Sequence, residues 1–222
     1  MINPKHWETK GEKMGFGKSE VFEETYANYL KELEQIDLKS RAETLGGKMK
    51  ETHLCLPFYD QWFTIGPEGI YDLSGKRCGF SVAVVLLKYI LMCPDKAVVP
   101  GGDWMTFRDF KDSGPLISYF TSNTNKTLEQ AFAGKCHLLK DACDSMGAEK
   151  GEFSDTYDVS LVVNVLPRIP VTINFNDRDE EFPAAASILY RQTTAEYLDM
   201  ESLAITGTWL SGKLLNYLSL DD

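Results

Sequence analysis

Residues 159–198 read VSLVVNVLPRIPVTINFNDRDEEFPAAASILYRQTTAEYL, and this stretch decides the fold. Apolar residues alternate from Val159 to Val165 and again from Val171 to Phe175, which is the period of two expected of half-buried strands. The two prolines between these runs predict the turn of an antiparallel hairpin, since proline is tolerated where a strand begins. Four carboxylates come next, and Pro183 then suits the first turn of a helix. The stretch therefore predicts a hairpin, an acidic loop and a helix in direct succession.

Further strands and helices are predicted on both sides of this hairpin. The period of two returns in residues 54–58, 62–65 and 70–73, and the turn Gly66-Pro67-Glu68-Gly69 predicts that the last two segments form a hairpin of a short meander. An extended clamp is predicted at Trp104–Phe110. Helical spacing and capping residues predict helices at 19–35 (capped by Ser19), 38–45 (between Asp37 and Gly46), 81–93, 115–120, 127–146 (capped by Thr127) and 200–218 (capped by Asp199).

The order of these elements indicates the fold class. Helices, strands, helices, strands and helices follow one another in runs, without the strict alternation of a parallel sheet. We therefore predict an α+β fold, a mainly antiparallel sheet covered by helices, in a single compact domain at residues 19–222. Residues 1–18 carry three glycines and no hydrophobic period, which predicts a loosely attached tail.

Composition excludes several classes of function. The chain has 222 residues, with 23 basic and 33 acidic side chains and a formal net charge of −10. This balance argues against a nucleic-acid partner, because such binding draws its affinity from clustered Lys and Arg. The longest apolar run, residues 80–93, is interrupted by Lys88 and is too short to cross a membrane. Residues 1–18 contain no hydrophobic signal core, so we expect a cytoplasmic protein.

Cysteine and histidine patterns give no sign of an iron–sulfur cluster or of zinc. The five cysteines contain no C-x-x-C pair, which predicts reduced thiols. Cys136 and Cys143 are two helical turns apart, and His137 points away from Cys136, so these residues do not predict a zinc site. Signatures of hydrolases, kinases and nucleotide-binding loops are also missing from the sequence.

The first candidate site is the acidic run of Asp177, Asp179, Glu180 and Glu181. Carboxylate oxygens at the end of a strand can bind Mg²⁺ or Ca²⁺, with Asp177, Asp179 and Glu181 as the ligands, or can act as a general acid and base. The run does not fit a calcium-binding EF-hand, because the sixth position is Phe182 where glycine is required.

A structural interpretation of the same run is also open. Acidic side chains that precede a helix begun by Pro183 would complement the positive end of its dipole. Arg178 next to the run, or Arg168 and Arg191 brought close by folding, could neutralise the remaining charge.

The second candidate site is Gly101, Gly102 and Trp104. A pair of glycines lets the backbone approach a ligand closely, and the indole offers a flat face for binding. The alternative is a tight turn with an anchoring aromatic residue.

Three segments carry a resemblance to a known family. These are PVTINFNDRDEEFPAAASILY at residues 170–190, the apolar helix that ends near Tyr89, and GGDWMTFRDF at residues 101–110. The chain resembles a family of domains of unknown function from anaerobic bacteria and archaea, with an acidic D-E-E-F-P run after a hydrophobic strand. The resemblance covers roughly Tyr26 to Leu215. Some relatives carry a four-cysteine iron–sulfur module and are linked to corrinoid and one-carbon metabolism, and this chain lacks such a module.

Three hypotheses of function follow, and the reaction, if there is one, is not identified. The first is an accessory or small-molecule-binding domain in anaerobic metabolism, which binds its ligand or partner with Gly101–Phe110 and Asp177–Glu181. The second is a hydrolase or transferase that uses a divalent cation at Asp177–Glu181. The third, which the resemblance implies, is a subunit that docks on a corrinoid or iron–sulfur enzyme of one-carbon metabolism.

Overall fold

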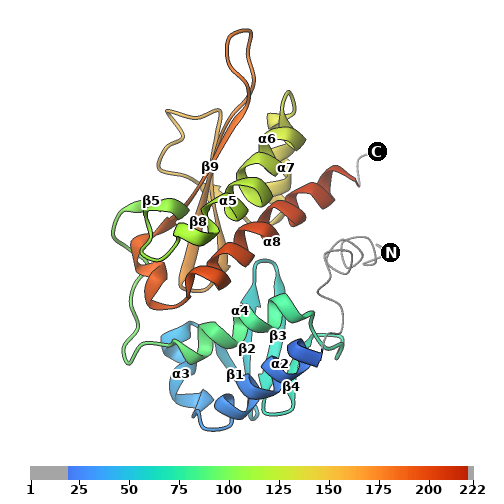
Figure 1. Cartoon of the computed structure of the whole chain (residues 1–222), viewed down its shortest axis with the longest axis vertical. Coiled ribbons are helices and arrows are strands. Elements are labelled where there is room, and N and C mark those ends of the chain that lie inside the picture. The colour runs from blue at the N-terminus through green and yellow to red at the C-terminus, as the bar shows by residue number, and fades with distance from the viewer. Residues whose placement is uncertain (1–19, 220–222) are drawn as a thin grey trace.

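The hairpin predicted at residues 159–176 forms the centre of the larger of two antiparallel sheets (Figure 1). In the computed structural model, which describes residues 20–219, β7 (Val159–Leu166) and β8 (Ile169–Asn176) pair with Val163 opposite Val171. β9 (Ala185–Arg191) and β5 (Trp104–Thr106) extend the sheet on the β8 side, and β6 (Glu149–Lys150) pairs with β7 on the other side. The strand order is therefore β5-β9-β8-β7-β6.

Alternation along these strands gives the large sheet two different faces. The inner face is apolar and carries Val163, Val171 and Tyr190 in one cross-strand row. The outer face carries Ser160, Asn174 and Ser187 in one row and Thr172 beside Leu189 in the next.

The smaller sheet has the order β1-β2-β3-β4 and corresponds to the predicted meander. Its strands are β1 (Lys48–Lys50), β2 (His53–Phe58), β3 (Gln61–Gly66) and β4 (Gly69–Asp72). One face is fully buried and carries Leu54, Leu56, Ile65 and Ile70. Three helices belong to this half of the molecule: α2 (Glu20–Leu33), α3 (Leu38–Leu45) and α4 (Phe80–Leu91).

Helices of the second half pack on the large sheet, and the last of them also contacts the small one. They are α5 (Ile117–Phe120), α6 (Lys126–Phe132), α7 (Cys136–Ser145) and α8 (Met200–Leu218), with a π-helical segment η3 (Thr121–Asn125) and short 3-10 turns η1 (Phe107–Asp109), η2 (Gly114–Leu116) and η4 (Gln192–Glu196). Along α8, Thr206 bonds to Tyr190 of β9 through its hydroxyl and accepts a bond from the Tyr59 hydroxyl through its carbonyl. The α8 residue Trp209 donates to the hydroxyl of Ser81 on α4, so α8 connects the two halves (Figure 1).

Arg168 forms a second connection between the two halves. It lies in the β7–β8 turn, and its guanidinium donates to the carbonyls of Glu43 and Thr44 at the end of α3. Tyr89 of α4 accepts a hydrogen bond from the Arg168 amide and donates to the Leu45 carbonyl. The bonds to Thr44 and Leu45 occupy carbonyls that the end of a helix leaves without partners, and the bond to Glu43 adds to the one that its carbonyl accepts from the Gly46 amide.

The predicted α+β class and single compact domain are confirmed, and so are three helix caps. Asp37 accepts from the amides of Lys39 and Ser40, Gly46 closes α3 at φ 71°, and Asp199 accepts from the amide of Ser202. None of the helices in the described range has the length and apolar character needed to cross a bilayer. The predicted tail and the Ser19 cap lie outside the described residues.

Two predicted helices are wrong. The segment after Pro183 is strand β9, because Ala186, Ile188 and Tyr190 alternate toward the inner face and β8 needs a partner on that side. The single helix predicted at 127–146 divides into α6 and α7 at Gly134, which adopts φ 76°. Thr127 does not cap it, since its hydroxyl donates to the Ser122 carbonyl inside a continuous helical run.

Candidate functional site

The acidic run forms the loop between β8 and β9, which projects from the body of the molecule (Figure 1). Asp177 accepts hydrogen bonds from the amides of Gly134 and Cys136 at the start of α7 and from the amide of Arg178. Burial raises the pKa of Asp177. The hydrogen bonds from the three amides lower the pKa by a larger amount, so it lies below its usual value. The structural interpretation expected acidic residues to complement the start of a helix begun by Pro183. Asp177 instead accepts from amides at the start of α7.

The rest of the acidic loop is folded on itself. Asp179 accepts from the amides of Glu181 and Phe182 at 2.8 and 2.7 Å, and Glu180 and Glu181 are exposed. Among residues 20–219, no group of three His, Cys, Asp or Glu side chains is placed to hold a metal ion. The three carboxylates considered as metal ligands are therefore not gathered at one point in this structure.

None of the three arginines considered as partners forms an ion pair with a carboxylate of this loop. Arg168 binds the end of α3, Arg191 pairs with Glu152, and the guanidinium of Arg178 lies beside Gly134. The loop keeps its negative charge at an exposed tip.

Gly101, Gly102 and Trp104 come together at the edge strand β5. Gly102 adopts φ 74°, and a Cβ atom there would lie 2.8 Å from the Gln192 side chain, so glycine is needed for the turn. The amide of Gly101 donates to the Thr193 hydroxyl. The guanidinium of Arg191 lies 4.0 Å from the centroid of the Trp104 ring, so one face of the indole is covered.

The two predicted groups do not form one surface. The acidic loop precedes β9 at Ala185, whereas Trp104 is opposite Arg191 at the other end of the same strand. Six residues of extended chain separate these ends by about 20 Å.

One cavity in the described structure was not predicted. It measures about 650 Å³ and lies between the end of α4, residues 111–116 and the start of α8, and we call it the α8 groove. Its apolar wall is formed by Met92, Pro115, Leu116, Ala195, Leu198 and Met200, and its charged rim by Lys111, Asp112, Asp199 and Glu201.

The charged residues of the α8 groove differ in how they are paired. Asp199 caps α8 and also pairs with Lys88 at 3.3 Å, so its charge is already compensated. Within residues 22–219, the side chains of Lys111, Asp112 and Glu201 form no ion pair or hydrogen bond, and all three are exposed. One cationic and two anionic groups therefore stand free around an apolar wall.

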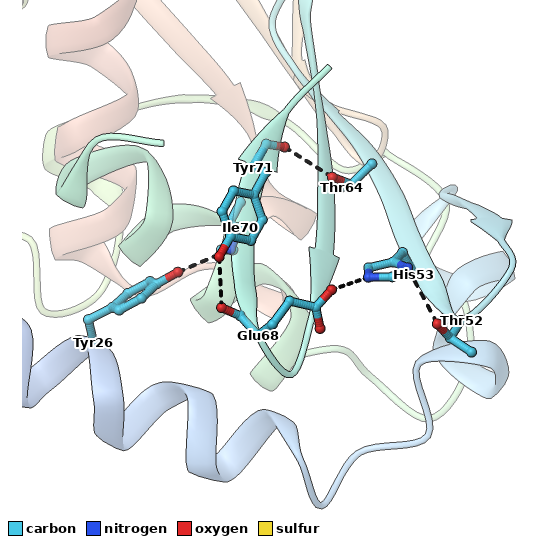
Figure 2. Close-up of polar contacts among 7 residues, drawn as sticks. All are labelled: Tyr26, Thr52, His53, Thr64, Glu68, Ile70 and Tyr71. Atoms are coloured by element: carbon cyan, nitrogen blue, oxygen red, sulfur yellow. Dashed lines mark hydrogen bonds and ion pairs between the residues drawn. The ribbon is translucent and has the colours of Figure 1, made fainter. Parts of the chain in front are cut away.

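The open face of the small sheet carries a histidine–glutamate pair (Figure 2). Nε2 of His53 contacts a carboxylate oxygen of Glu68, and its Nδ1 lies 3.4 Å from the Thr52 hydroxyl. The hydrogen bond from His53 lowers the pKa of Glu68. A cavity of about 260 Å³ lies beside the pair, lined by Lys50, Glu51, His53 and Thr64.

Exposure limits what this pair can do. Side-chain exposure is 33% for His53 and 53% for Glu68, and such ion pairs contribute little to stability. Tyr71 donates to the Glu68 carbonyl and Tyr26 accepts from the Ile70 amide, so the pair belongs to a network that holds the β3–β4 turn (Figure 2). The sequence placed His53 on the polar face of its strand, and its position opposite Gly66 could have indicated Glu68 as its partner.

Cys78, Cys93, Cys136 and Cys143 each have a thiol whose pKa is raised by burial. Burial raises the pKa of both Cys78 and Cys143 to about 12, and that of Cys136 is raised first by burial and then by Asp177. A thiol with a raised pKa is a poor nucleophile at neutral pH.

Comparisons with known proteins give one match. A family model described as a domain of unknown function (DUF3786) matches residues 37–213. No curated protein and no solved structure matches the chain. The matched range begins at the cap of α3 and ends within α8, so it includes both sheets and all residues that line the α8 groove.

Proposed function

This chain belongs to the DUF3786 family, whose function is unknown, and we propose that it is a small-molecule-binding domain whose ligand occupies the α8 groove. The observation that carries the proposal is the groove itself. Its volume of about 650 Å³ lies within the range of small-molecule sites, and such sites combine apolar walls with a few polar groups.

Residues of the groove indicate the kind of ligand. Met92 and Met200 have flexible, polarisable side chains that adapt to the shape of an apolar group. Lys111 can donate to an oxygen of the ligand, and the carboxylates of Asp112 and Glu201 can accept from its N–H or O–H groups. We therefore propose a small amphipathic molecule with both donors and acceptors.

The position of the groove also supports binding. Its walls come from Met92, which directly follows α4 in the small-sheet half, and from residues 111–116 and 195–201 in the large-sheet half. Ligand sites form preferentially where two packed units meet. The Asp199–Lys88 pair spans the same junction and fixes the start of α8 against α4.

The test follows the methyl groups of methionine by NMR while a library of small amphipathic metabolites is added. A ligand of the groove should give saturable shifts at Met92 and Met200 and leave Met49 on β1 unchanged. Leu116→Trp should abolish the shifts by filling the groove. Leu73→Trp, at a side chain that is 74% exposed and outside the groove, is the matched control.

Two results would contradict the proposal. One is a library in which no compound shifts Met92 and Met200, and the other is a set of shifts that survives Leu116→Trp in a folded variant. The cation-dependent hydrolase or transferase, the docking subunit, the cytoplasmic location and the link to anaerobic one-carbon metabolism stay predictions.

A further inference from the structure

The free charges of the α8 groove come from two segments of the chain. Lys111 and Asp112 lie in the turn that precedes η2, and Glu201 lies in the first turn of α8. All three side chains line the same cavity as the apolar wall, and all three are exposed. Asp199 already caps α8 and pairs with Lys88, so it matches the positive end of the helix dipole. The groove therefore offers one cation and two anions to its occupant.

Buried residues hold the turn that carries Lys111 and Asp112. Phe110 and Ser113, which flank the pair, are only 5% and 2% exposed. The Ser113 hydroxyl donates to the Arg108 carbonyl, and the Ser113 amide donates to the Phe110 carbonyl. Asp112 adopts φ 65°, in the left-handed region that aspartate and asparagine tolerate better than most other side chains. The two charged side chains are therefore carried by a backbone turn that is anchored on both sides.

A ligand that covers the apolar wall of the groove displaces water from these charges. Charged groups that lose water without gaining a partner cost free energy. An anionic ligand would leave Asp112 and Glu201 without partners, and a cationic ligand would leave Lys111 without one. A zwitterion gives each of these groups a partner. One ammonium is sufficient for both carboxylates, because it carries three N–H donors.

We propose that the ligand of the α8 groove is a short apolar peptide with free ends, an inference that rests on the proposed function. The terminal carboxylate of the peptide accepts from Lys111, and its terminal ammonium donates to Asp112 and Glu201. Its side chains pack on the apolar wall, where Met92 and Met200 adapt to their shape. The groove volume of about 650 Å³ is that of a site for a drug-sized ligand, which leaves room for about two or three residues.

The experiment titrates the whole chain with the dipeptide leucyl-leucine and follows the methyl groups of Met92 and Met200 by NMR. Two capped peptides are the matched ligand controls. N-acetyl-leucyl-leucine lacks the ammonium, and leucyl-leucine amide lacks the carboxylate. We expect saturable shifts with leucyl-leucine and a Kd about two- to fivefold higher for each capped form, because each capped form loses an exposed ion pair.

Two variants assign each charge of the peptide to its partner. The double variant of Asp112→Asn and Glu201→Gln should remove the preference for leucyl-leucine over its N-acetyl form and keep the preference over its amide. Lys111→Met should do the reverse. Asparagine tolerates the left-handed backbone of residue 112, so the turn is kept. Glu180→Gln, which removes an exposed carboxylate outside the groove, is the control and should keep both preferences.

Failure of the peptide proposal can be distinguished from failure of the groove as a site. Equal Kd values for leucyl-leucine and both capped forms would exclude a zwitterion, although the groove would still bind a ligand. The same conclusion follows if only other compounds shift Met92 and Met200, or if both charge variants change the two preferences alike. If no compound shifts the two methionines, the groove is not a ligand site and both proposals fail.

Discussion

Gly207 and Gly212 lie on the same helix, yet a methyl group should have opposite effects at the two positions. A Cβ atom at Gly207 would lie 2.4 Å from the Phe120 ring and 2.7 Å from the Thr124 hydroxyl, whereas nothing lies within 4 Å at Gly212. Gly207→Ala should lower the free energy of unfolding by about 1–3 kcal/mol through overpacking. Gly212→Ala should raise it by about 0.5–1 kcal/mol through helix propensity.

Urea unfolding followed by far-UV circular dichroism measures both changes on one helix. Each variant serves as the control for the other, because helix propensity contributes equally at the two positions. A stabilised Gly207→Ala variant would show that α8 does not approach η3 as closely as described.

At the scale of an element, the acidic loop should act on stability through Asp177 alone. Asp177→Asn removes the negative charge at the start of α7 and should cost about 0.3–1 kcal/mol at pH 7. The folded-state pKa is lowered, so this stabilisation is complete above the unfolded-state value of about 3.9 and is lost as the pH falls through the folded-state value.

The measurement compares urea midpoints at pH 7 and pH 2.5. Glu180→Gln, in the same loop with an exposed side chain, is the control and should change stability by less than about 0.5 kcal/mol. If the difference between the Asp177→Asn and native proteins were the same at both pH values, the ionised cap would have no role.

The hairpin and the acidic loop also illustrate what local sequence can predict. The alternation of apolar residues over seven positions was sufficient to predict β7. The Gly-Pro-Glu-Gly turn was sufficient to predict the β3–β4 hairpin. Strands of two or three residues, β1, β5 and β6, have too little sequence for a period, and their pairing depends on partners far along the chain. Pro183 favoured a helix in the next segment, but that segment pairs with β8 and forms strand β9.

The candidate sites depend on local sequence to different degrees. Gly101, Gly102 and Trp104 were singled out because glycine and tryptophan have local signatures. The structure forms a turn at Gly102, and the binding role of these residues stays a prediction. The α8 groove could not be predicted in this way, because its walls come from residue 92, residues 111–116 and residues 195–201. Only the packing of α4 against α8 places these segments side by side.

At the scale of the whole molecule, α8 and Arg168 should make the two halves unfold as one unit. Thr206 on α8 bonds to Tyr59 in the β2–β3 turn and to Tyr190 on β9, and Arg168 joins the β7–β8 turn to α3. We therefore expect the most protected amides of β2 and β8 to exchange with the same free energy in native-state hydrogen exchange. Arg168→Ala removes the partner of the Thr44 carbonyl at the end of α3 and should lower both values equally, by about 1–3 kcal/mol. Arg178→Ala, at an exposed arginine of the acidic loop, should change neither. Loss of protection in β2 alone would mean that the small sheet opens independently, and the α8 groove would then lose its α4 wall while the large sheet stayed folded.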